Sequence, residues 1–291
     1  MQSVTSRAAN GSVELAWERL GPGTGEPLLL VMGFAVQRQF WPDGLCAQLV
    51  GAGFDVVRFD NRDAGESTHL TELSAPRLPA VMTVPKLVSR YRLEDLAADT
   101  AAVITAAGWD SAHAVGVSMG GMIAQTLAIT DPARVRSLTS ISSTPAPKIG
   151  RPTPAASRIF FIPRPRSPEE AADRIVEQFR IIGSPGFPLE EAWLREYAAA
   201  AFRRSHDEAG MARQLAAVMA SGSRVDRLAS VKAPTLVIHG TDDPLIRPQG
   251  GLSTARAVPG SRLVLHGGMG HDLPRALWPA ITNDIAKVAA L

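Results

Sequence analysis

Short apolar runs alternate with amphipathic segments along most of the chain. The apolar runs predict strands that are buried on both faces, and they lie at 27–33, 54–60, 112–118, 135–142, 234–240 and 262–267. Residues 13–20 alternate between apolar and polar positions and predict an edge strand. Helical spacing of apolar residues occurs at 40–50, 93–107, 119–129 and 274–290. This order predicts an α/β fold with a mostly parallel sheet and helices on both faces.

The alternation stops between residues 144 and 228. This stretch opens with a loop rich in Pro and Arg and continues through three helical patterns, at 168–182, 189–203 and 207–221. A helical cap inserted between two core strands accounts for the pattern. We therefore expect a core made of 1–143 and 229–291 and a cap made of 144–228. A second irregular stretch, 68–92, is expected to extend the rim of the cap.

Composition and charge exclude several classes of protein. The chain has 291 residues, 45% of them hydrophobic, which suits one large core or a core with an insertion. Its net charge is only +2 and no long Lys/Arg tract occurs, which argues against a nucleic-acid partner. Cys46 is the single cysteine, so an intrachain disulfide is excluded. The sequence shows neither a secretory signal nor a run long enough to span a bilayer, and we expect a cytoplasmic protein without a membrane partner.

The most specific chemical motif is Gly-Val-Ser-Met-Gly at 116–120, between a predicted strand and a predicted helix. G-x-S-x-G in this context is typical of a nucleophile elbow, a tight turn that exposes the serine hydroxyl. Glycines flank the serine because side chains there would collide with neighbouring backbone. An ordinary Gly-rich turn could contain the same pentapeptide, but the strand before it and the helix after it favour Ser118 as a nucleophile.

A serine nucleophile needs a general base that is oriented by a third group. In hydrolases with this elbow, the acid follows the serine in the chain and the histidine comes last. The strand at 234–240 leads into Asp242 and Asp243, and the strand at 262–267 leads into His271. We expect Asp243 to be the acid and His271 the base. Asp242 is expected to bond to the backbone of the turn.

The remaining candidate residues have roles in binding or in structure. The backbone N–H groups of Phe34 and Met119 are expected to stabilise an oxyanion. The charged loop at 59–67, with Ser67, is interpreted as a self-neutralising part of the rim, and Cys46 as a small buried thiol. The other histidines are expected in strands (His113, His239, His266) or on the surface (His69, His206). No group of His, Cys and acidic residues has metal-ligand spacing, so we expect neither a metal nor a cofactor.

Taken together, these motifs resemble the α/β-hydrolase fold superfamily. The segments that carry the resemblance are PLLLVMG (27–33), RFDNRDAGES (58–67), GVSMGG (116–121), TDDP (241–244) and GMGH (268–271). Val-Met-Gly at 31–33, followed by Trp-Pro at 41–42, is most similar to the aclacinomycin methylesterase-like carboxylesterases. The likeness covers 1–145 and 230–291 and fades through the cap. It implies a cap over the pocket and the same roles for the five candidate site residues, but it does not extend to the substrate.

The sequence therefore predicts a serine carboxylesterase that hydrolyses a small-molecule ester through an acyl-enzyme, as a monomer or homodimer and without a cofactor. A C–C bond hydrolase or an acyltransferase would use the same triad. From other classes, a non-catalytic ligand-binding module remains an alternative. So does an interaction protein that docks through the Arg/Pro-rich segment 148–166, although we interpret that segment first as a hinge of the cap.

Overall fold

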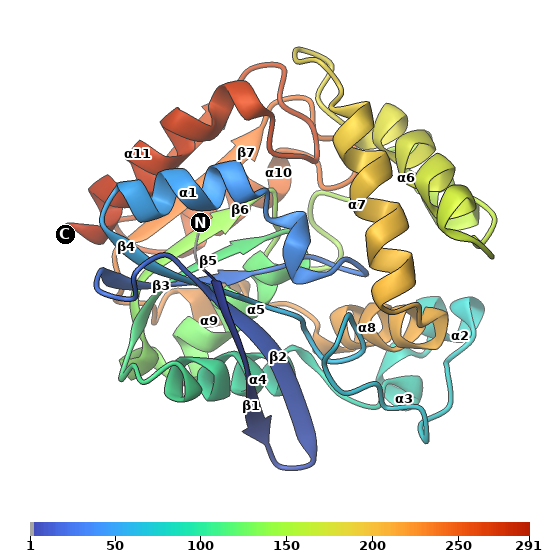
Figure 1. Cartoon of the computed structure of the whole chain (residues 1–291), viewed down its shortest axis with the longest axis horizontal. Coiled ribbons are helices and arrows are strands. Elements are labelled where there is room, and N and C mark those ends of the chain that lie inside the picture. Colours follow the sequence, from blue (N-terminus) through green and yellow to red (C-terminus); the bar gives the residue numbers. More distant parts are fainter. Residues whose placement is uncertain (1–2) are drawn as a thin grey trace.

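The computed structural model describes residues 3–291, in which eight strands form one central sheet (Figure 1). The strands are β1 (Ser3–Asn10), β2 (Val13–Leu20), β3 (Glu26–Val31), β4 (Phe54–Phe59), β5 (Ala112–Val117), β6 (Val135–Ile141), β7 (Thr235–Gly240) and β8 (Arg262–His266). Their order in the sheet is β1-β2-β4-β3-β5-β6-β7-β8. The strands from β4 to β8 in this order run parallel, whereas β2 is antiparallel to β1 and to β4. The predicted mostly parallel sheet is confirmed.

The prediction that residues 13–20 form an edge strand is wrong, because β1 pairs along the whole length of β2. Most side chains of β1 are exposed, so its sequence carries no burial pattern. The ladder to β2 holds β1 in place instead. A tight turn joins the two strands, with Gly11 at a φ of +60°, a conformation that glycine adopts without strain.

Helices cover both faces of the sheet (Figure 1). On one face lie α1 (Asp43–Gly51) and α11 (Trp278–Ala289), and on the other lie α4 (Leu93–Ala106), α5 (Met119–Thr130), α9 (Val225–Leu228) and α10 (Gln249–Ala257). Short 3₁₀ turns occur at η1 (Arg38–Phe40), η2 (Pro132–Arg134), η3 (Ala156–Phe161) and η4 (Arg275–Leu277). The four helices predicted outside the cap are confirmed. The helix α10, which connects β7 to β8, was not predicted.

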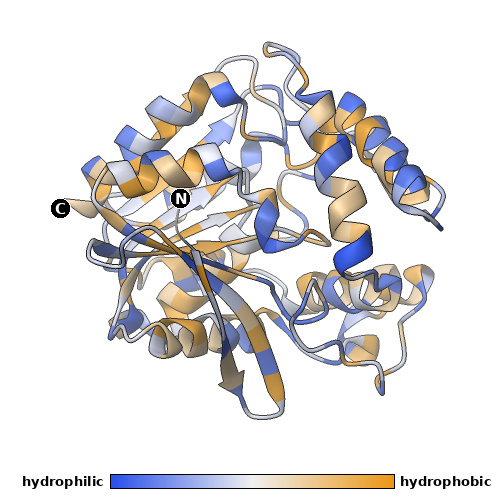
Figure 2. Ribbon diagram, in the orientation of Figure 1, coloured by the Kyte–Doolittle hydropathy of each residue, from blue (hydrophilic) through white to orange (hydrophobic). Residues whose placement is uncertain are grey.

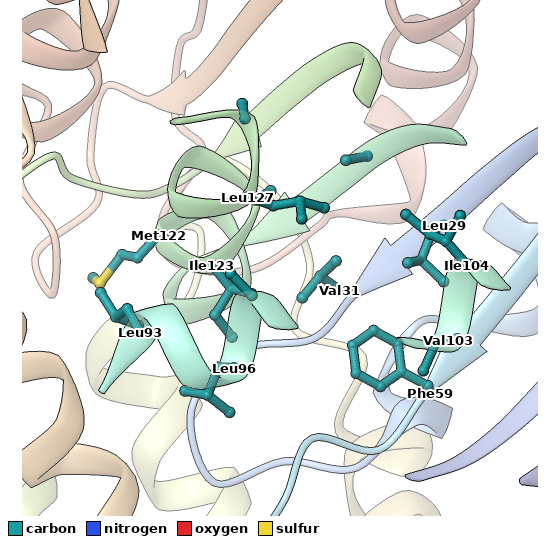
Figure 3. Packing of buried hydrophobic residues seen from close by; sticks show 14 of the residues in the cluster. Leu29, Val31, Phe59, Leu93, Leu96, Val103, Ile104, Met122, Ile123 and Leu127 are labelled. Atoms are coloured by element: carbon teal, nitrogen blue, oxygen red, sulfur yellow. The ribbon is translucent and has the colours of Figure 1, made fainter. Parts of the chain in front are cut away.

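Two hydrophobic cores form because successive side chains of a strand point to opposite faces. Leu29 and Val31 of β3 pack with α4 and α5, and Figure 3 shows these contacts together with Phe59. Leu28 and Leu30 point the other way, toward α1 and α11. The apolar stretches of the central strands are visible in Figure 2. Of the helices between residues 3 and 291, none combines the length and the apolar character that crossing a membrane requires.

The predicted helical insertion between β6 and β7 is confirmed as α6 (Pro168–Ile182), α7 (Glu191–Arg204) and α8 (Glu208–Ser221). The pair α6 and α7 shares a small apolar core of its own. The irregular stretch at 68–92 contains α2 (Leu78–Thr83) and α3 (Pro85–Val88), which pack against α8. We propose that the cap comprises 144–228, inserted between core segments 1–143 and 229–291, although α9 at the end of this range packs on the core helices α5 and α10.

Buried ion pairs join the cap to the loop that follows β4. Arg213 of α8 donates from Nε and Nη2 to the Asp63 carboxylate at 2.9 and 2.7 Å, and its side chain is 1% exposed. Arg204 of α7 and Arg38 of η1 both contact Asp60 at 2.6 Å. Burial raises the pKa of Asp60 to about 6, although Arg38 beside it acts in the opposite direction. The charged loop is thus neutralised from the cap as well as from the core.

Replacing Arg213 by Met should lower the free energy of unfolding by about 3–5 kcal/mol, because Asp63 would remain buried without its cation. Urea unfolding followed by circular dichroism measures the loss. The matched control is Arg195→Met on α7, whose ion pairs to Asp173 and Glu191 are exposed; this change should lower stability by less than about 1 kcal/mol. Equal losses in the two variants would contradict the assignment of a buried ion pair.

Candidate active site

Ser118 occupies a sharp turn between β5 and α5. Its φ of 57° and ψ of −120° are uncommon for a residue with a side chain. A Cβ on Gly116 would overlap the backbone of Gly120, and a Cβ on Gly120 would overlap the Val31 carbonyl of β3. Only glycine fits at both positions, so the local sequence builds the predicted elbow and brings Ser118 to the end of the sheet.

The structure brings Ser118, His271 and Asp243 together. His271 Nε2 lies 3.0 Å from Ser118 Oγ, and His271 Nδ1 lies 2.7 Å from Asp243 Oδ2. The two contacts fit the tautomer in which Nδ1–H donates to Asp243 and Nε2 accepts from the hydroxyl of Ser118. Ser118 lies 153 positions before His271 in the chain, and Asp243 lies 28 positions before it. The three side chains nevertheless form one continuous line of hydrogen bonds.

The two adjacent aspartates have different surroundings. The side chain of Asp243 is fully buried, and its Oδ1 accepts the N–H groups of Leu245 and Ile246, both at 2.9 Å. These bonds hold the other oxygen toward His271. Asp242 is exposed, and it accepts the N–H of Gly268, 26 residues away, at 3.0 Å. It therefore joins its turn to the loop after β8, whereas the sequence predicted a bond to the backbone of its own turn.

Phe34 and Met119 line the same cavity as Ser118. Met119 is the first residue of α5, so its N–H has no carbonyl partner four residues earlier in the helix. The loop that contains Phe34 lies against the serine, since a Cβ on Gly33 would be 3.3 Å from the Cβ of Ser118. The next residue of the loop, Ala35, donates its N–H to Gln214 of the cap at 3.0 Å.

The loop that carries His271 is bound to the end of α6 and to the linker between α6 and α7. His271 N donates to the Ile182 carbonyl at 2.8 Å, and Gly270 N donates to Ser184 Oγ at 2.8 Å. Ser184 in turn donates to the carboxylate of Asp272, whose pKa is raised by burial. Sequence reasoning missed Ser184 and Asp272, because a lone Ser in a linker carries no recognisable motif.

Two of the remaining histidines make buried hydrogen bonds, and His206 is exposed as predicted. His113 contacts Ser137 at 2.8 Å and His239 donates to the Ile246 carbonyl at 2.7 Å, as expected for buried hydrogen-bonding residues. The expectation of a surface position for His69 is wrong: it is half-buried, with Nδ1 2.8 Å from Asp207. The cap covers it, and the distance in sequence between the two partners hid this contact.

His69 and the carboxylates of Asp63 and Asp207 form a cluster within which ligand atoms lie no more than 4.8 Å apart. Arg213 donates to both carboxylates, and His69 Nε2 lies 2.9 Å from the Gly65 carbonyl. Protein partners therefore already neutralise the cluster, and we do not infer a metal site from it.

Two other side chains have structural roles that agree with the sequence interpretation. Ser67 Oγ donates to the Asp60 carbonyl at 2.6 Å and accepts the Ala16 N–H at 2.9 Å. Cys46 is buried, which raises the pKa of its thiol to about 12. A thiol in this state is a packing residue rather than a nucleophile.

Two cavities flank the line of hydrogen bonds. The larger, about 1070 Å³, is lined by Ser118, Phe34, Met119 and much of the cap. The smaller, about 500 Å³, is lined by His271 but not by Ser118. Five aromatic side chains are among the residues that line it, and they are Phe40, Phe179, Trp193, Tyr197 and Trp278. The first two and Tyr197 also line the larger cavity. His271 lines both cavities, so the two spaces meet at the candidate base.

A mostly parallel sheet with helices on both faces, a nucleophile elbow and a Ser–His–Asp arrangement together characterise the α/β-hydrolases. Residues 26–274 match the family model described as alpha/beta hydrolase fold, and the chain belongs to this family. It is 30% identical to rhodomycin D methylesterase of Streptomyces peucetius, over 97% of this chain and 96% of that protein. A rhodomycin D methylesterase from Streptomyces sp. strain C5 is also 30% identical, with the same coverage. The resemblance to α/β-hydrolases of the methylesterase type is thus confirmed.

Solved structures agree on the fold. A hydrolase from Pseudomonas aeruginosa superposes with a TM-score of 0.72 at 23% identity, covering 99% of this chain and 98% of that one. An esterase from Rhodococcus gives a TM-score of 0.72 at 18% identity, covering 100% and 99%. At these identities the likeness concerns the architecture alone.

Replacing Ser184 by Ala should lower kcat for a soluble ester about tenfold with little change in KM. The variant loses the bonds to Gly270 and Asp272 that fix the His271 loop, each worth about 1 kcal/mol. Steady-state kinetics with a p-nitrophenyl ester measures the effect. Ser230→Ala, which removes an exposed hydroxyl bonded to the Arg227 carbonyl, is the control and should leave both constants unchanged. An unchanged kcat in the Ser184 variant would mean that the linker does not position His271.

Proposed function

We propose that this protein is a serine carboxylesterase with Ser118 as nucleophile, His271 as general base and Asp243 as the acid that orients it. The observation that carries the proposal is the line of hydrogen bonds from Ser118 Oγ through His271 to the buried Asp243, at 3.0 and 2.7 Å. The methylesterase relatives support an ester as the substrate class.

The proposed reaction has two halves that use the same groups. His271 takes the proton of Ser118 as Oγ attacks the ester carbonyl, and Asp243 stabilises the imidazolium. The N–H groups of Phe34 and Met119 donate to the oxyanion. His271 then protonates the departing alcohol, which leaves an acyl-enzyme. Water, deprotonated by His271, attacks the acyl-enzyme and releases the acid, so the steps require no cofactor.

The two cavities suggest how the ester lies in the site. The leaving oxygen must receive a proton from His271, so the alcohol part lies on the His271 side of the serine. We propose that the smaller, aromatic cavity takes the alcohol and the larger cavity takes the acid. The volume of about 1070 Å³ is sufficient for a large acyl group, such as a polycyclic carboxylic acid.

Replacing Ser118 by Ala should lower ester hydrolysis by about 10⁴-fold or more, with the melting temperature nearly unchanged. Turnover of p-nitrophenyl esters measures the activity. A fluorophosphonate probe should label the wild type and not the variant. Retention of activity would overturn the proposal, and faster product transfer to an added alcohol than to water would identify an acyltransferase instead.

The adjacent aspartates provide a matched control for the triad. Asp243→Asn should reduce kcat by about 10⁴-fold, because the amide no longer holds the required tautomer of His271. Asp242→Asn changes the same chemical group one residue away and should leave kcat near the wild-type value. The reverse result would assign the acid to Asp242.

Replacing Trp193 by Ala should lower kcat/KM for a benzyl ester about fivefold to tenfold, while kcat/KM for the methyl ester of the same acid changes little. Trp193 lines only the smaller cavity, and an aromatic pair contributes about 1 kcal/mol beyond the area that it buries. Leu215→Ala, in the larger cavity, is the reciprocal control and should change the preference among acids. Equal effects of Trp193→Ala on both alcohols would contradict this assignment of the cavities.

A further inference from the structure

Two segments at the edge of the larger cavity carry basic residues and no acidic ones. Segment 75–92 contains Arg77, Lys86, Arg90 and Arg92, and segment 148–166 contains Lys148, Arg151, Arg158, Arg164 and Arg166. Neither segment contains Asp or Glu. Because the whole chain has a net charge of only +2, the rest of the chain is net negative. Positive charge is therefore concentrated around this cavity.

Most of this charge is not neutralised locally. Arg164 pairs with Glu208 and Arg166 pairs with Glu170. Within residues 3–291, the other seven basic side chains of the two segments have no carboxylate within 4.0 Å, and all seven residues are exposed. They produce a positive surface that attracts an anionic partner.

The same two segments expose large apolar side chains. Six of the nine large hydrophobic residues that are exposed between residues 3 and 291 belong to them: Leu78, Met82, Val84, Leu87, Phe160 and Phe161. Leu87 is 79% exposed and Phe161 is 74% exposed. Figure 2 shows the apolar character of α3 at the lower right of the molecule. Apolar side chains gathered on a surface mark an interaction site.

The apolar and basic residues lie where the cavity opens. Leu78, Phe160 and Phe161 are exposed and also line the cavity that contains Ser118, as do Arg77 and Arg151. Side chains that face both solvent and the cavity form its rim, and we call this rim, together with the rest of segments 75–92 and 148–166, the mouth. The mouth is thus formed from two separate parts of the chain that share one composition.

We propose that this mouth docks on an anionic lipid surface, with the cavity that contains Ser118 facing the lipid. Basic side chains are attracted to anionic headgroups, and exposed apolar side chains insert at the boundary between headgroups and acyl chains. Docking in this way brings an amphiphilic ester from the lipid directly to the cavity. The sequence expectation of no membrane partner rested on the lack of a spanning run, and peripheral docking needs none.

The docking is tested by sedimentation of the full chain with vesicles of phosphatidylcholine, with or without phosphatidylglycerol. The chain should sediment with the vesicles that contain phosphatidylglycerol, and less so as the salt concentration rises. Absence of binding to either vesicle, or equal binding to both without an effect of salt, would overturn the proposal and direct attention to an acidic protein partner.

Two variants separate the electrostatic and apolar contributions. Lys86→Gln/Arg90→Gln/Arg158→Gln should weaken binding at least about tenfold, since each basic side chain near an anionic surface contributes severalfold to the affinity. Leu87→Ser/Phe161→Ser should also weaken it. The matched controls are Lys232→Gln/Arg256→Gln/Lys287→Gln, with the same change of charge elsewhere, and Val4→Ser/Leu265→Ser. Controls that bind as weakly as the variants of the mouth would overturn the proposal.

Vesicle binding needs no turnover, so Ser118→Ala should bind vesicles as the wild type does. The docking proposal can therefore hold even if the proposed esterase reaction fails. The triple basic variant should hydrolyse a short, neutral, soluble ester at the wild-type rate, because none of its three residues lines either cavity. If that variant instead raises KM for a soluble ester bearing a carboxylate and still binds vesicles normally, the mouth recognises a free anionic substrate, and the lipid proposal is wrong.

Discussion

The close approach of α5 to the ends of β3 and β5 is the constraint on which the rest of the structure depends. Gly116 and Gly120 allow backbone to touch backbone there, and Ser118 takes a left-handed φ as a consequence. The serine therefore stands at the end of the parallel strands, where the loops after β3, β7 and β8 also converge. Phe34, Asp243 and His271 reach the serine from these three loops, and Met119 follows it directly at the start of α5.

The sequence predicted most of the core because burial on both faces of a parallel strand produces continuous apolar runs. Strand β1 escaped prediction since its hydrogen bonds to β2, and not burial, hold it in place. The helix α10 escaped because its sequence, QGGLSTARA, contains two glycines and few apolar residues. Both elements escaped prediction for the same reason. An element that is held mainly by contacts with its neighbours has no clear hydrophobic pattern in its own sequence.

In the candidate site, too, some groups could be predicted from local sequence and others could not. Ser118, Asp243 and His271 were predictable because each follows a strand and because their order in the chain is characteristic. Contacts made by the cap were not predictable, since they join residues that no local motif connects. His69 was misassigned to the surface for this reason. The bonds from Ser184 to the His271 loop remained hidden for the same reason.

The cap is therefore part of the site as well as its cover. Gln214 holds the loop that contains Phe34, and Ile182 and Ser184 hold the loop that contains His271. A displacement of these cap segments would move the groups that flank the serine. The mouth, where residues of α2 and η3 line the larger cavity, involves neither of these attachments.

The buried pairing of Arg204 and Arg213 with Asp60 and Asp63 has a consequence for any exchange of the cap of this chain by recombination. A cap acquired from another hydrolase would leave Asp63 without its cation and Asp60 with Arg38 alone, unless the loop at 60–67 came with it. Cap and loop are far apart in the gene, so a single crossover cannot transfer both and keep the rest of the core. In this chain, single substitutions at cap residues that line the cavities leave these pairs intact, whereas replacement of the whole cap removes both arginines.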